Sequence, residues 1–313
     1  MKELAIISGS SNEKLAQAIC EKLGVVPTKV LTSAFGNGER RVEIQENVRN
    51  KDVFVIQSAS DTTNDHLMEL LLLLDTLKRS SCYRVITVMP CFPYARQDRK
   101  MKSRTPVSAK LVANLITTAG TDRFLTSEMH SPQSCAFFDL PVDNLHMFKL
   151  FVPHIKKNHP NNSICVVAPD AGSIKIAKSY SGKLNCGVAM IYKHRSAPSE
   201  IGEMCLIGEV RDKHCIIIDD MVDSGGTLIK ASNLLVSNGA SSVECYCTHA
   251  ILSGKAAYNI SRSSIKRLYV SDTIDNPRVK PAENIESLSA APLFSEAIKG
   301  INNEQSLSHL FDD

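Results

Sequence analysis

Three aspartates and a turn of small residues follow one strongly apolar run of the chain. The run begins at Cys215 and leads into Asp219-Asp-Met-Val-Asp223 and then Ser224-Gly-Gly-Thr227. It predicts a buried parallel strand, and residues 228–236 predict the helix that follows. Backbone N–H groups at a helix N-terminus attract a phosphate, whereas neighbouring carboxylates repel one. Both features fit a sugar phosphate, because carboxylates accept hydrogen bonds from a sugar diol and hold Mg²⁺ through water.

The alternative is an ordinary strand–helix connection, since Gly-Gly and Asp are common turn residues and Asp often caps a helix. Two carboxylates at the strand end, a third one three residues later and then Ser-Gly-Gly-Thr favour a binding site. The segment lacks the lysine of a nucleotide-triphosphate P-loop, so that interpretation is weak.

A second candidate site is the basic segment 90–104, which follows another apolar run. Two aromatic residues, Phe92 and Tyr94, could stack on a base. Arginines pair well with phosphates, and the segment contains the cations Arg96, Arg99, Lys100, Lys102 and Arg104. A solvated loop or an RNA-contacting patch is the alternative. The position after a strand, where open α/β sheets bind ligands, favours a nucleotide.

Other segments have suitable residue types but are ambiguous by themselves. Phe35-Gly-Asn-Gly-Glu39 is, in isolation, a glycine-rich turn. His130 follows an apolar run and could hold a divalent cation with carboxylates such as Asp139 and Asp143, although a lone histidine is more often structural.

Asp170 lies in Pro169-Asp-Ala-Gly172 after an apolar run, where it either contacts a ligand or caps the next helix. Lys193-His-Arg195 opens a polar stretch. Paired cations on a mobile loop suit closure over a transferring phosphoryl group, but a plain surface loop is also compatible with this spacing.

The elements that must position these residues alternate between strand and helix. Short β-branched runs predict strands at residues 4–7, 53–57, 85–89, 164–168, 188–191, 215–219, 243–248 and 268–270. Helical patterns cover residues 13–23, 66–80, 108–119, 173–181, 227–236 and 254–260. This rhythm predicts an α/β protein with mainly parallel sheets flanked by helices.

The length of 313 residues allows two domains, each with its own core. A polar stretch at 156–163 after an apolar helical segment places the boundary so that the domains are 1–148 and 149–313. The tail after about residue 295 has enough apolar residues to pack, and the first domain is a candidate surface for it.

Composition narrows the class of protein. Hydrophobic content of 43% and charged content of 22% are typical of a globular protein, and a net charge of +3 argues against a dedicated nucleic-acid or membrane partner. The ten cysteines form no C-x-x-C pair, which predicts no zinc site, no disulfide framework and a reducing compartment.

The most apolar segment, 67–77, is interrupted by Glu69 and Asp75 and predicts a buried helix. With an N-terminus too polar for a secretory signal, we expect a cytoplasmic protein.

Together these segments resemble the ribose-phosphate diphosphokinase family, also called phosphoribosyl diphosphate (PRPP) synthetases, and most closely its phosphate-regulated class I. The resemblance covers nearly the whole chain. It is carried by CFPYARQDRK from residue 91, SRTPVSAKLVAN from residue 103, FFDLPVDNL at 137–145, PDAG at 169–172 and DDMVDSGGT at 219–227. It implies two similar type I phosphoribosyltransferase-like domains. It also implies a transferase that moves the diphosphoryl group of MgATP to the 1-hydroxyl of D-ribose 5-phosphate, giving PRPP and AMP for nucleotide biosynthesis.

The resemblance also implies roles for individual residues. The residues that would contact ATP are Phe35, Asn37, Glu39, Arg96, Gln97, Asp98, Arg99 and His130. The loop 35–39 would reach ATP across a subunit interface. The implied catalytic residues are Lys193 and Arg195, and the residues linked to Mg²⁺ are His130 and Asp170. The diphosphate loop is Asp170, Ala171, Gly172 and Ser173. The residues implied to bind ribose 5-phosphate are Arg195, Asp219, Asp220, Asp223, Ser224, Gly225, Gly226 and Thr227.

The partners implied are ATP, ribose 5-phosphate and further copies of the chain, as a hexamer built from dimers, with no nucleic acid and no membrane. Inorganic phosphate and ADP are hypotheses as regulators, because residues 131–136 depart from the family pattern in a region associated with that regulation. Glu128 stands where aspartate is usual, Ser173 replaces a second glycine and Ile176 replaces a basic residue. A serine at 173 could crowd the close backbone approach that a pyrophosphate requires.

Two other functions stay open. A non-catalytic regulatory or scaffolding homologue would explain these departures. A nucleobase phosphoribosyltransferase shares the acidic loop but would need only one such domain and no YARQD segment.

Overall fold

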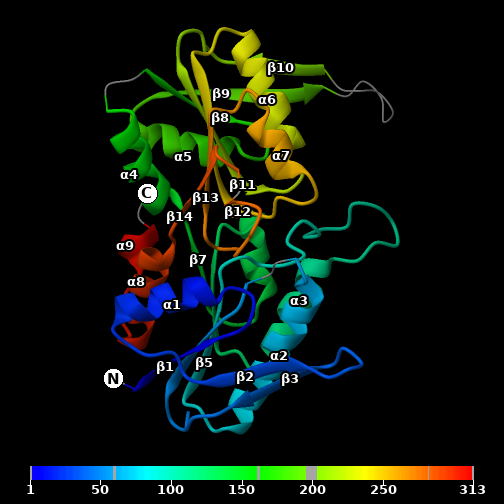
Figure 1. The fold of residues 1–313 in the computed structure, drawn as a ribbon, viewed down its shortest axis with the longest axis vertical. Coiled ribbons are helices and arrows are strands. Elements are labelled where there is room, and N and C mark those ends of the chain that lie inside the picture. The colour runs from blue at the N-terminus through cyan, green and yellow to red at the C-terminus, as the bar shows by residue number, and fades with distance from the viewer. Residues whose placement is uncertain (1, 59–60, 161–162, 195–202, 281, 312–313) are drawn as a thin grey trace. The chain divides into compact units, whose positions relative to one another are not determined.

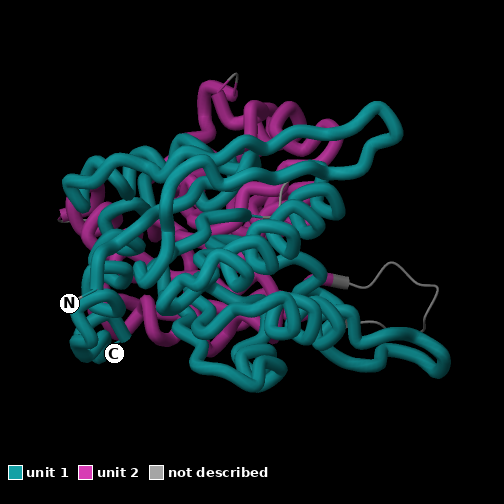
Figure 2. The backbone as a smooth tube through the Cα atoms, turned by 90° about the horizontal axis from the view of Figure 1, so that it is seen from below, with its two compact units in different colours: residues 1–147, 273–275, 289–312 teal, residues 148–272, 276–288, 313 magenta. Residues whose placement is uncertain are grey.

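The computed structural model describes residues 2–58, 61–160, 163–194, 203–280 and 282–311. The chain forms two compact units, which Figure 2 draws in different colours. Unit 1 contains residues 1–147, 273–275 and 289–312, and unit 2 contains residues 148–272, 276–288 and 313. Each unit has its own mainly parallel sheet and its own apolar core, which confirms the predicted α/β class.

The main sheet of unit 1 has five parallel strands in the order β1-β4-β5-β6-β7. Figure 1 labels β1, β5 and β7 of this sheet. The strands are β1 (Leu4–Ser8), β4 (Asp52–Ile56), β5 (Arg84–Met89), β6 (Arg123–Ser127) and β7 (Val142–Leu145). Every residue of β4 is buried, as expected of a parallel strand that is covered on both faces.

The helices of unit 1 are α1 (Glu13–Leu23), α2 (Thr63–Arg79), α3 (Ser108–Ala119), α8 (Ala291–Asn302) and α9 (Ser308–Phe311), with a 3₁₀ turn η1 (Pro132–Phe137). The bounds of α1 and α3 are the predicted ones. Helix α2 buries four leucines, which confirms the buried helix expected at 67–77. Helix α8 was not predicted as a helix, and it lies beside α1 (Figure 1).

Unit 1 also contains a separate antiparallel ribbon of β2 (Val30–Ala34) and β3 (Arg40–Ile44), neither of which was predicted as a strand. The register runs from Val30 opposite Ile44 to Ala34 opposite Arg40. Along β3, half-buried residues at 40, 42 and 44 alternate with exposed ones at 41 and 43. One face of the ribbon therefore packs on the core of unit 1, and the loop 35–39 joins its two strands.

Unit 2 has a seven-stranded sheet in the order β10-β9-β8-β11-β12-β13-β14, parallel except for the edge strand β10. The strands are β8 (Ile164–Ala168), β9 (Gly187–His194), β10 (Glu203–Ile207), β11 (His214–Val222), β12 (Ser242–Ala250), β13 (Arg267–Ser271) and β14 (Ile285–Leu288). The helices are α4 (Phe148–Asn158), α5 (Ile174–Leu184), α6 (Gly226–Ser237) and α7 (Ala256–Ser261). None of the helices that the structure describes has both the length and the apolar character needed to cross a bilayer.

Candidate active site

The predicted sugar-phosphate segment lies where two neighbouring parallel strands of unit 2 end. Strand β8 ends at Ala168, whereas β11 continues past it, paired on one side with β12 as far as Val222. Asp219 and Asp220 therefore lie within β11 but beyond the end of β8. The strand was predicted to end at Asp219, and in the structure it continues three residues further, to Val222. The extra length comes from β12, whose residue Cys247 pairs with Asp219.

The structure brings two of the predicted carboxylates together at this point. Ser173 Oγ lies 3.1 Å from Asp170 Oδ1 and 3.4 Å from Asp219 Oδ1, and the Ser173 N–H also donates to Asp170 Oδ1. The hydroxyl of Ser173 is thus turned toward the carboxylates, while Ala171 and Gly172 are exposed. We call Asp170, Ser173, Asp219, Asp220 and Asp223, with the first turns of α5 and α6, the acidic edge of unit 2.

The acidic edge changes the protonation of its most enclosed carboxyl. Burial raises the pKa of Asp219 to about 8, and the neighbouring carboxylates of Asp220 and Asp170 add to this rise. Like charges so close together cannot all ionise at neutral pH, so Asp219 keeps its proton. A cation or a set of hydroxyl donors at this edge would favour the ionised form.

Two helices begin at the acidic edge with open first turns. Helix α6 follows Gly225, whose φ of 75° is a left-handed conformation and whose added β-carbon would lie 2.9 Å from Ile260 Cδ1. A glycine is therefore required there. Within the described chain, neither Gly225 nor Ser173, the N-cap residues of α6 and α5, gives a side-chain acceptor to the turn that follows. Such turns favour an anion. Ser224 is exposed, and Asp223, Gly226 and Thr227 are half-buried around this turn.

One predicted catalytic cation, Lys193, lies near the same edge of the sheet. Lys193 lies in β9, three residues after Met190, whose partner in β8 is Ala168. The backbone of Lys193 therefore lies beyond the end of β8, where it pairs with Met204 of β10. Arg195 lies outside the described residues.

In unit 1, the basic segment connects β5 to α3. Phe92 was expected to stack on a base, and this is wrong. Its ring is buried against Phe124 and Phe138, at centroid distances of 5.8 and 5.7 Å, because an edge-to-face aromatic cluster fills the core there. Tyr94 has a positive φ of 58°, and its exposed ring donates a hydrogen bond from the hydroxyl to Asn64 Oδ1.

The predicted ATP-contacting residues of this segment follow Tyr94. The Gln97 N–H donates to the Tyr94 carbonyl over 3.0 Å, and Gln97 Oε1 accepts a hydrogen bond from Ser108 Oγ at the start of α3. These bonds fix the first turn of the segment. Arg96 and Arg99 are exposed and Asp98 is half-buried.

The loop 35–39 forms the tip of the β2–β3 ribbon. The Phe35 N–H donates to the Glu39 carbonyl over 2.8 Å, and Asn37 Oδ1 accepts from the Glu39 N–H over 3.1 Å. The ring of Phe35 is 54% exposed, so this tight loop presents an aromatic face at the surface.

His130 is exposed after β6, and the carboxylates suggested as its metal partners are engaged elsewhere. Asp143 accepts two hydrogen bonds from Arg123, over 2.5 and 2.9 Å, and Asp139 lies 3.9 Å from Lys110 Nζ. The expectation that Asp143 joins His130 around a cation is therefore wrong, since its charge is already paired in the sheet. Nowhere in the described ranges do three or more His, Cys, Asp or Glu residues form a group that could hold a metal ion.

Glu128, which replaces an aspartate, has a structural contact of its own. Its φ is 38°, and Oε1 accepts a hydrogen bond over 2.8 Å from the Met147 N–H. Oε2 lies 3.5 Å from His146 Nδ1. The longer side chain thus reaches the end of unit 1.

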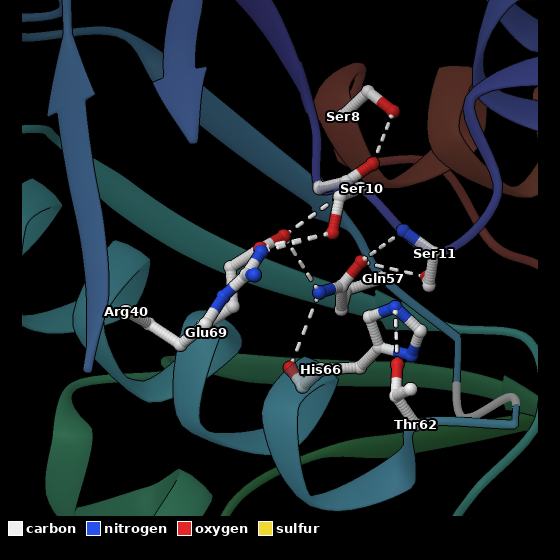
Figure 3. A network of polar contacts seen from close by, with 9 residues as sticks. Ser8, Ser10, Ser11, Arg40, Gln57, Thr62, His66 and Glu69 are labelled. Atoms are coloured by element: carbon white, nitrogen blue, oxygen red, sulfur yellow. Dashed lines mark hydrogen bonds and ion pairs between the residues drawn. The ribbon is translucent and has the colours of Figure 1, made fainter. Parts of the chain in front are cut away.

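Sequence reasoning missed one polar cluster of unit 1, which Figure 3 shows. Glu69 is fully buried in α2 and contacts Ser10, Arg40 and Gln57. A charged residue among the core positions of an apolar helix was the available signal, because carboxylates are almost never fully buried unless they are paired.

Two family models match the chain. The first, described as the N-terminal domain of ribose phosphate pyrophosphokinase, matches residues 4–120, and the second, a phosphoribosyl transferase domain, matches residues 149–273.

Full-length relatives agree with these models. A ribose-phosphate pyrophosphokinase of Rhizobium meliloti (strain 1021) is 46% identical over 310 residues, which cover 99% of this chain and 100% of that protein. One from Clostridium tetani is 44% identical over 317 residues, with 99% and 98% covered. The crystal structure of phosphoribosylpyrophosphate synthetase from Mycobacterium smegmatis matches with a TM-score of 0.92 and 36% identity, over 97% of this chain and 100% of that one.

Proposed function

This chain belongs to the ribose-phosphate pyrophosphokinase family, and we propose that the acidic edge of unit 2 is its site for ribose 5-phosphate. The reaction is the transfer of the diphosphoryl group of ATP to the 1-hydroxyl of ribose 5-phosphate, which yields PRPP and AMP. The enzyme is a transferase of nucleotide biosynthesis.

One observation supports the site above all others: carboxylates stand beside two open helix N-termini at the ends of β8 and β11. The start of α6 suits the 5-phosphate, and the carboxylates suit the ring hydroxyls. The residues proposed for ribose 5-phosphate are Arg195, Asp219, Asp220, Asp223, Ser224, Gly225, Gly226 and Thr227. The start of α5, with Asp170, Ala171, Gly172 and Ser173, is proposed for the diphosphate.

The ATP site is proposed on segments of the first domain, residues 1–148, and the ribose-5-phosphate site on the second, residues 149–313. The residues that would contact ATP are Phe35, Asn37, Glu39, Arg96, Gln97, Asp98, Arg99 and His130. Exposed Phe35 and Tyr94 offer aromatic surface for a base, and exposed arginines at 96 and 99 offer charge for phosphates.

The residues at the acidic edge fit Mg²⁺ as a cofactor. Mg²⁺ prefers oxygen ligands and usually keeps several waters, so that one or two carboxylates and substrate phosphates suffice to hold it. Asp170 is the proposed carboxylate ligand at this edge. His130, on unit 1, is proposed separately as a residue linked to Mg²⁺. When bound, Mg²⁺ offsets the negative charge of the reacting phosphates.

Catalysis then rests on positioning and charge. The acidic edge orients the sugar by its hydroxyls and the α6 N-terminus holds its phosphate, so that the 1-hydroxyl faces the β-phosphoryl group in line. Charge grows on the oxygens of that group and on departing AMP, and we assign its neutralisation to Lys193 and Arg195. Ser173 keeps the Asp170 carboxylate oriented through two hydrogen bonds.

Binding of ribose 5-phosphate with Mg²⁺ at pH 7 is expected to release protons. Asp219 has a pKa of about 8 because of burial and of the Asp220 and Asp170 charges, so it is mainly protonated at pH 7. A cation at the acidic edge favours its ionised form. Calorimetric titrations in two buffers of different ionisation enthalpy measure the released protons. Equal heats in both buffers would contradict this assignment.

An assay for AMP on the purified protein, with ATP, Mg²⁺ and ribose 5-phosphate, tests the proposed function. AMP release without added partners excludes a non-catalytic scaffold. A scaffold would release no AMP but would still bind ribose 5-phosphate. A nucleobase phosphoribosyltransferase would instead consume PRPP.

We also propose that the chain assembles with itself, as a hexamer built from dimers, and that inorganic phosphate activates and ADP inhibits it. Running the AMP assay with and without phosphate or ADP tests the regulators. Light scattering after size-exclusion chromatography tests the assembly.

A further inference from the structure

The β2–β3 ribbon carries the loop 35–39 without sharing a backbone ladder with the main sheet of unit 1. A backbone hydrogen bond from the Thr28 N–H to the Ile6 carbonyl, over 2.7 Å, ties the chain just before β2 to β1, and side-chain contacts position the rest of the ribbon. Along β3 the inward positions are Arg40, Val42 and Ile44, and the two apolar ones pack on the core of unit 1. Arg40 is the inward residue nearest the loop, directly opposite Ala34 at the other end of the loop.

Arg40 meets a fully buried carboxylate. Its Nη2 contacts Glu69 Oε2 and lies 3.3 Å from Ser10 Oγ (Figure 3). Glu69 comes from the second turn of α2 and is 0% exposed. Arg40 is the cation that forms an ion pair with this carboxylate. Half of the charge pair therefore belongs to the helix and half to the ribbon.

Glu69 is itself held in place by the chain that follows β1. Its Oε1 accepts hydrogen bonds from the Ser10 N–H over 2.7 Å and from Gln57 Nε2 over 3.0 Å, and its Oε2 accepts from Ser10 Oγ over 2.9 Å. Gln57 Oε1 in turn accepts from the N–H and the hydroxyl of Ser11. We call Ser10, Ser11, Arg40, Gln57 and Glu69 the Glu69 cluster.

The cluster leaves little freedom to its members. A β-carbon added at Gly9 would lie 2.3 Å from Gln57 Oε1, so the backbone passes directly against the amide. Burial by itself would raise the pKa of the Glu69 carboxyl, but the hydrogen bonds from the Ser10 N–H and from Arg40 outweigh it and lower the pKa. The carboxylate is thus charged, and its counter-charge is on the ribbon.

We propose that Arg40, anchored by the Glu69 cluster, is a positioning residue that fixes the loop 35–39 for its contact with ATP. This inference rests on the proposed function, in which Phe35, Asn37 and Glu39 contact ATP. The ion pair sits at the base of the loop, so its loss frees the loop while the apolar contacts of Val42 and Ile44 keep the ribbon folded on the unit.

The test compares Arg40→Met and Arg40→Lys with Arg41→Ala, all in the full-length protein. Arg40→Met keeps an unbranched apolar stem but removes the charge. Arg41 is a matched control, because it is the next residue, points outward and pairs only with Glu43 on its own strand in the described chain. A misplacement of about 1 Å in a positioned group can cost about 10²-fold in rate.

Arg40→Met should make the loop 35–39 more mobile without unfolding it. We therefore expect its KM for MgATP to rise about tenfold, which is less than the cost of about 10²-fold for a full misplacement. The KM for ribose 5-phosphate should stay within about twofold, since the acidic edge is untouched. Arg40→Lys, which keeps the charge but not the planar fork, should recover part of the loss. Arg41→Ala should behave as wild type. Assays are run well below the melting temperature of each variant.

Amide hydrogen exchange gives a second readout that needs no turnover. The Phe35 and Gly38 N–H groups, bonded within the loop, should exchange faster in Arg40→Met and not in Arg41→Ala. An unchanged KM for MgATP with unchanged exchange would overturn the proposal, and so would equal rises in both KM values, which indicate general destabilisation. A wild-type protein that releases no AMP overturns the proposed function and with it the role in ATP binding. Faster exchange in Arg40→Met would still support the anchoring of the loop in that case.

Discussion

Replacing Lys193 with alanine is expected to lower kcat by about 10²–10³-fold, the typical effect of removing one preorganised charge from a transition state. Lys193 lies beyond the end of β8, on the edge of the sheet where the sugar phosphate is proposed to bind. Its charge matters most when negative charge grows on the transferring group and on AMP. Ground-state binding of ribose 5-phosphate should therefore change by less than about twofold. Turnover is measured by AMP release and binding by calorimetry.

Lys230→Ala is the matched control for this variant, because it removes an exposed lysine of the same unit, on α6, outside the residues proposed to bind ribose 5-phosphate. It should turn over like wild type. Wild-type turnover in Lys193→Ala would refute the assignment of this lysine. An equal loss in both variants would mean that the net charge of the unit, rather than Lys193, controls the rate.

Asp219→Asn is expected to make the ligand-free protein more stable and nearly inactive at the same time. Asparagine removes the like-charge repulsion at the acidic edge, which should raise the melting temperature at pH 8 by several degrees, given about 2–4 °C per kcal/mol for a unit of this size. It also replaces charge-assisted hydrogen bonds to the sugar, each worth about 1.5–3 kcal/mol. We expect kcat/KM for ribose 5-phosphate to fall by about 10²-fold or more, as two such bonds imply.

The gain in stability should depend on pH with a definite sign. The folded pKa of Asp219, about 8, is above the ordinary value of 3.8. Folding therefore takes up a proton at Asp219 between these values, so that the contribution of this carboxyl to wild-type stability falls as the pH rises from about 4 to about 8. The difference in melting temperature between Asp219→Asn and wild type should be small near pH 4 and largest above pH 8.

Asp212→Asn serves as the control for Asp219→Asn. Asp212 is exposed and lies just before β11 begins, at the opposite end of that strand from Asp219, and it has a positive φ of 60°, which asparagine tolerates. Its melting temperature should follow wild type at every pH. A gain in Asp219→Asn that is the same at pH 5 and pH 8 would contradict the electrostatic explanation.

Local pattern was enough to predict the elements that end on clear signals. Helix α1 begins after Asn12, which caps it by accepting from the Leu15 N–H, and ends at Gly24 in a left-handed conformation. Strand β8 is a short β-branched run with its predicted bounds. Strand β8 leads directly into Asp170 and Ser173, so the sequence correctly placed these two residues just after the end of a strand.

Pairing between distant segments was not predictable in the same way. The short alternating strands of the β2–β3 ribbon were hidden because only half of their residues are apolar. The end of β11 was set too early because the partner that extends it, β12, follows more than twenty residues later.

Two residues were given chemical roles that their neighbours exclude. Asp143 pairs with Arg123 across the adjacent strands β6 and β7, and the register that joins them is visible only in the structure. Phe92 fills space beside Phe124 and Phe138. In both cases the residue type was suitable for binding a ligand. A side chain from another segment, however, pairs with the charge of Asp143, and aromatic rings from other segments pack against the ring of Phe92.

The loops that follow β1 and β8 differ in whether groups of the protein or groups of a ligand pair with their hydrogen-bond donors and charges. After β1 the chain uses its own glutamate and glutamine, so unit 1 depends on nothing from outside at that place. Beside the end of β8, Asp170, Asp219 and Asp220 lie close together. Ser173 donates to Asp170 and Asp219 keeps its proton, and a ligand that carries cations or hydroxyls would relieve the remaining repulsion. Resistance to heat and to proteases should consequently rise with the concentrations of ribose 5-phosphate and Mg²⁺.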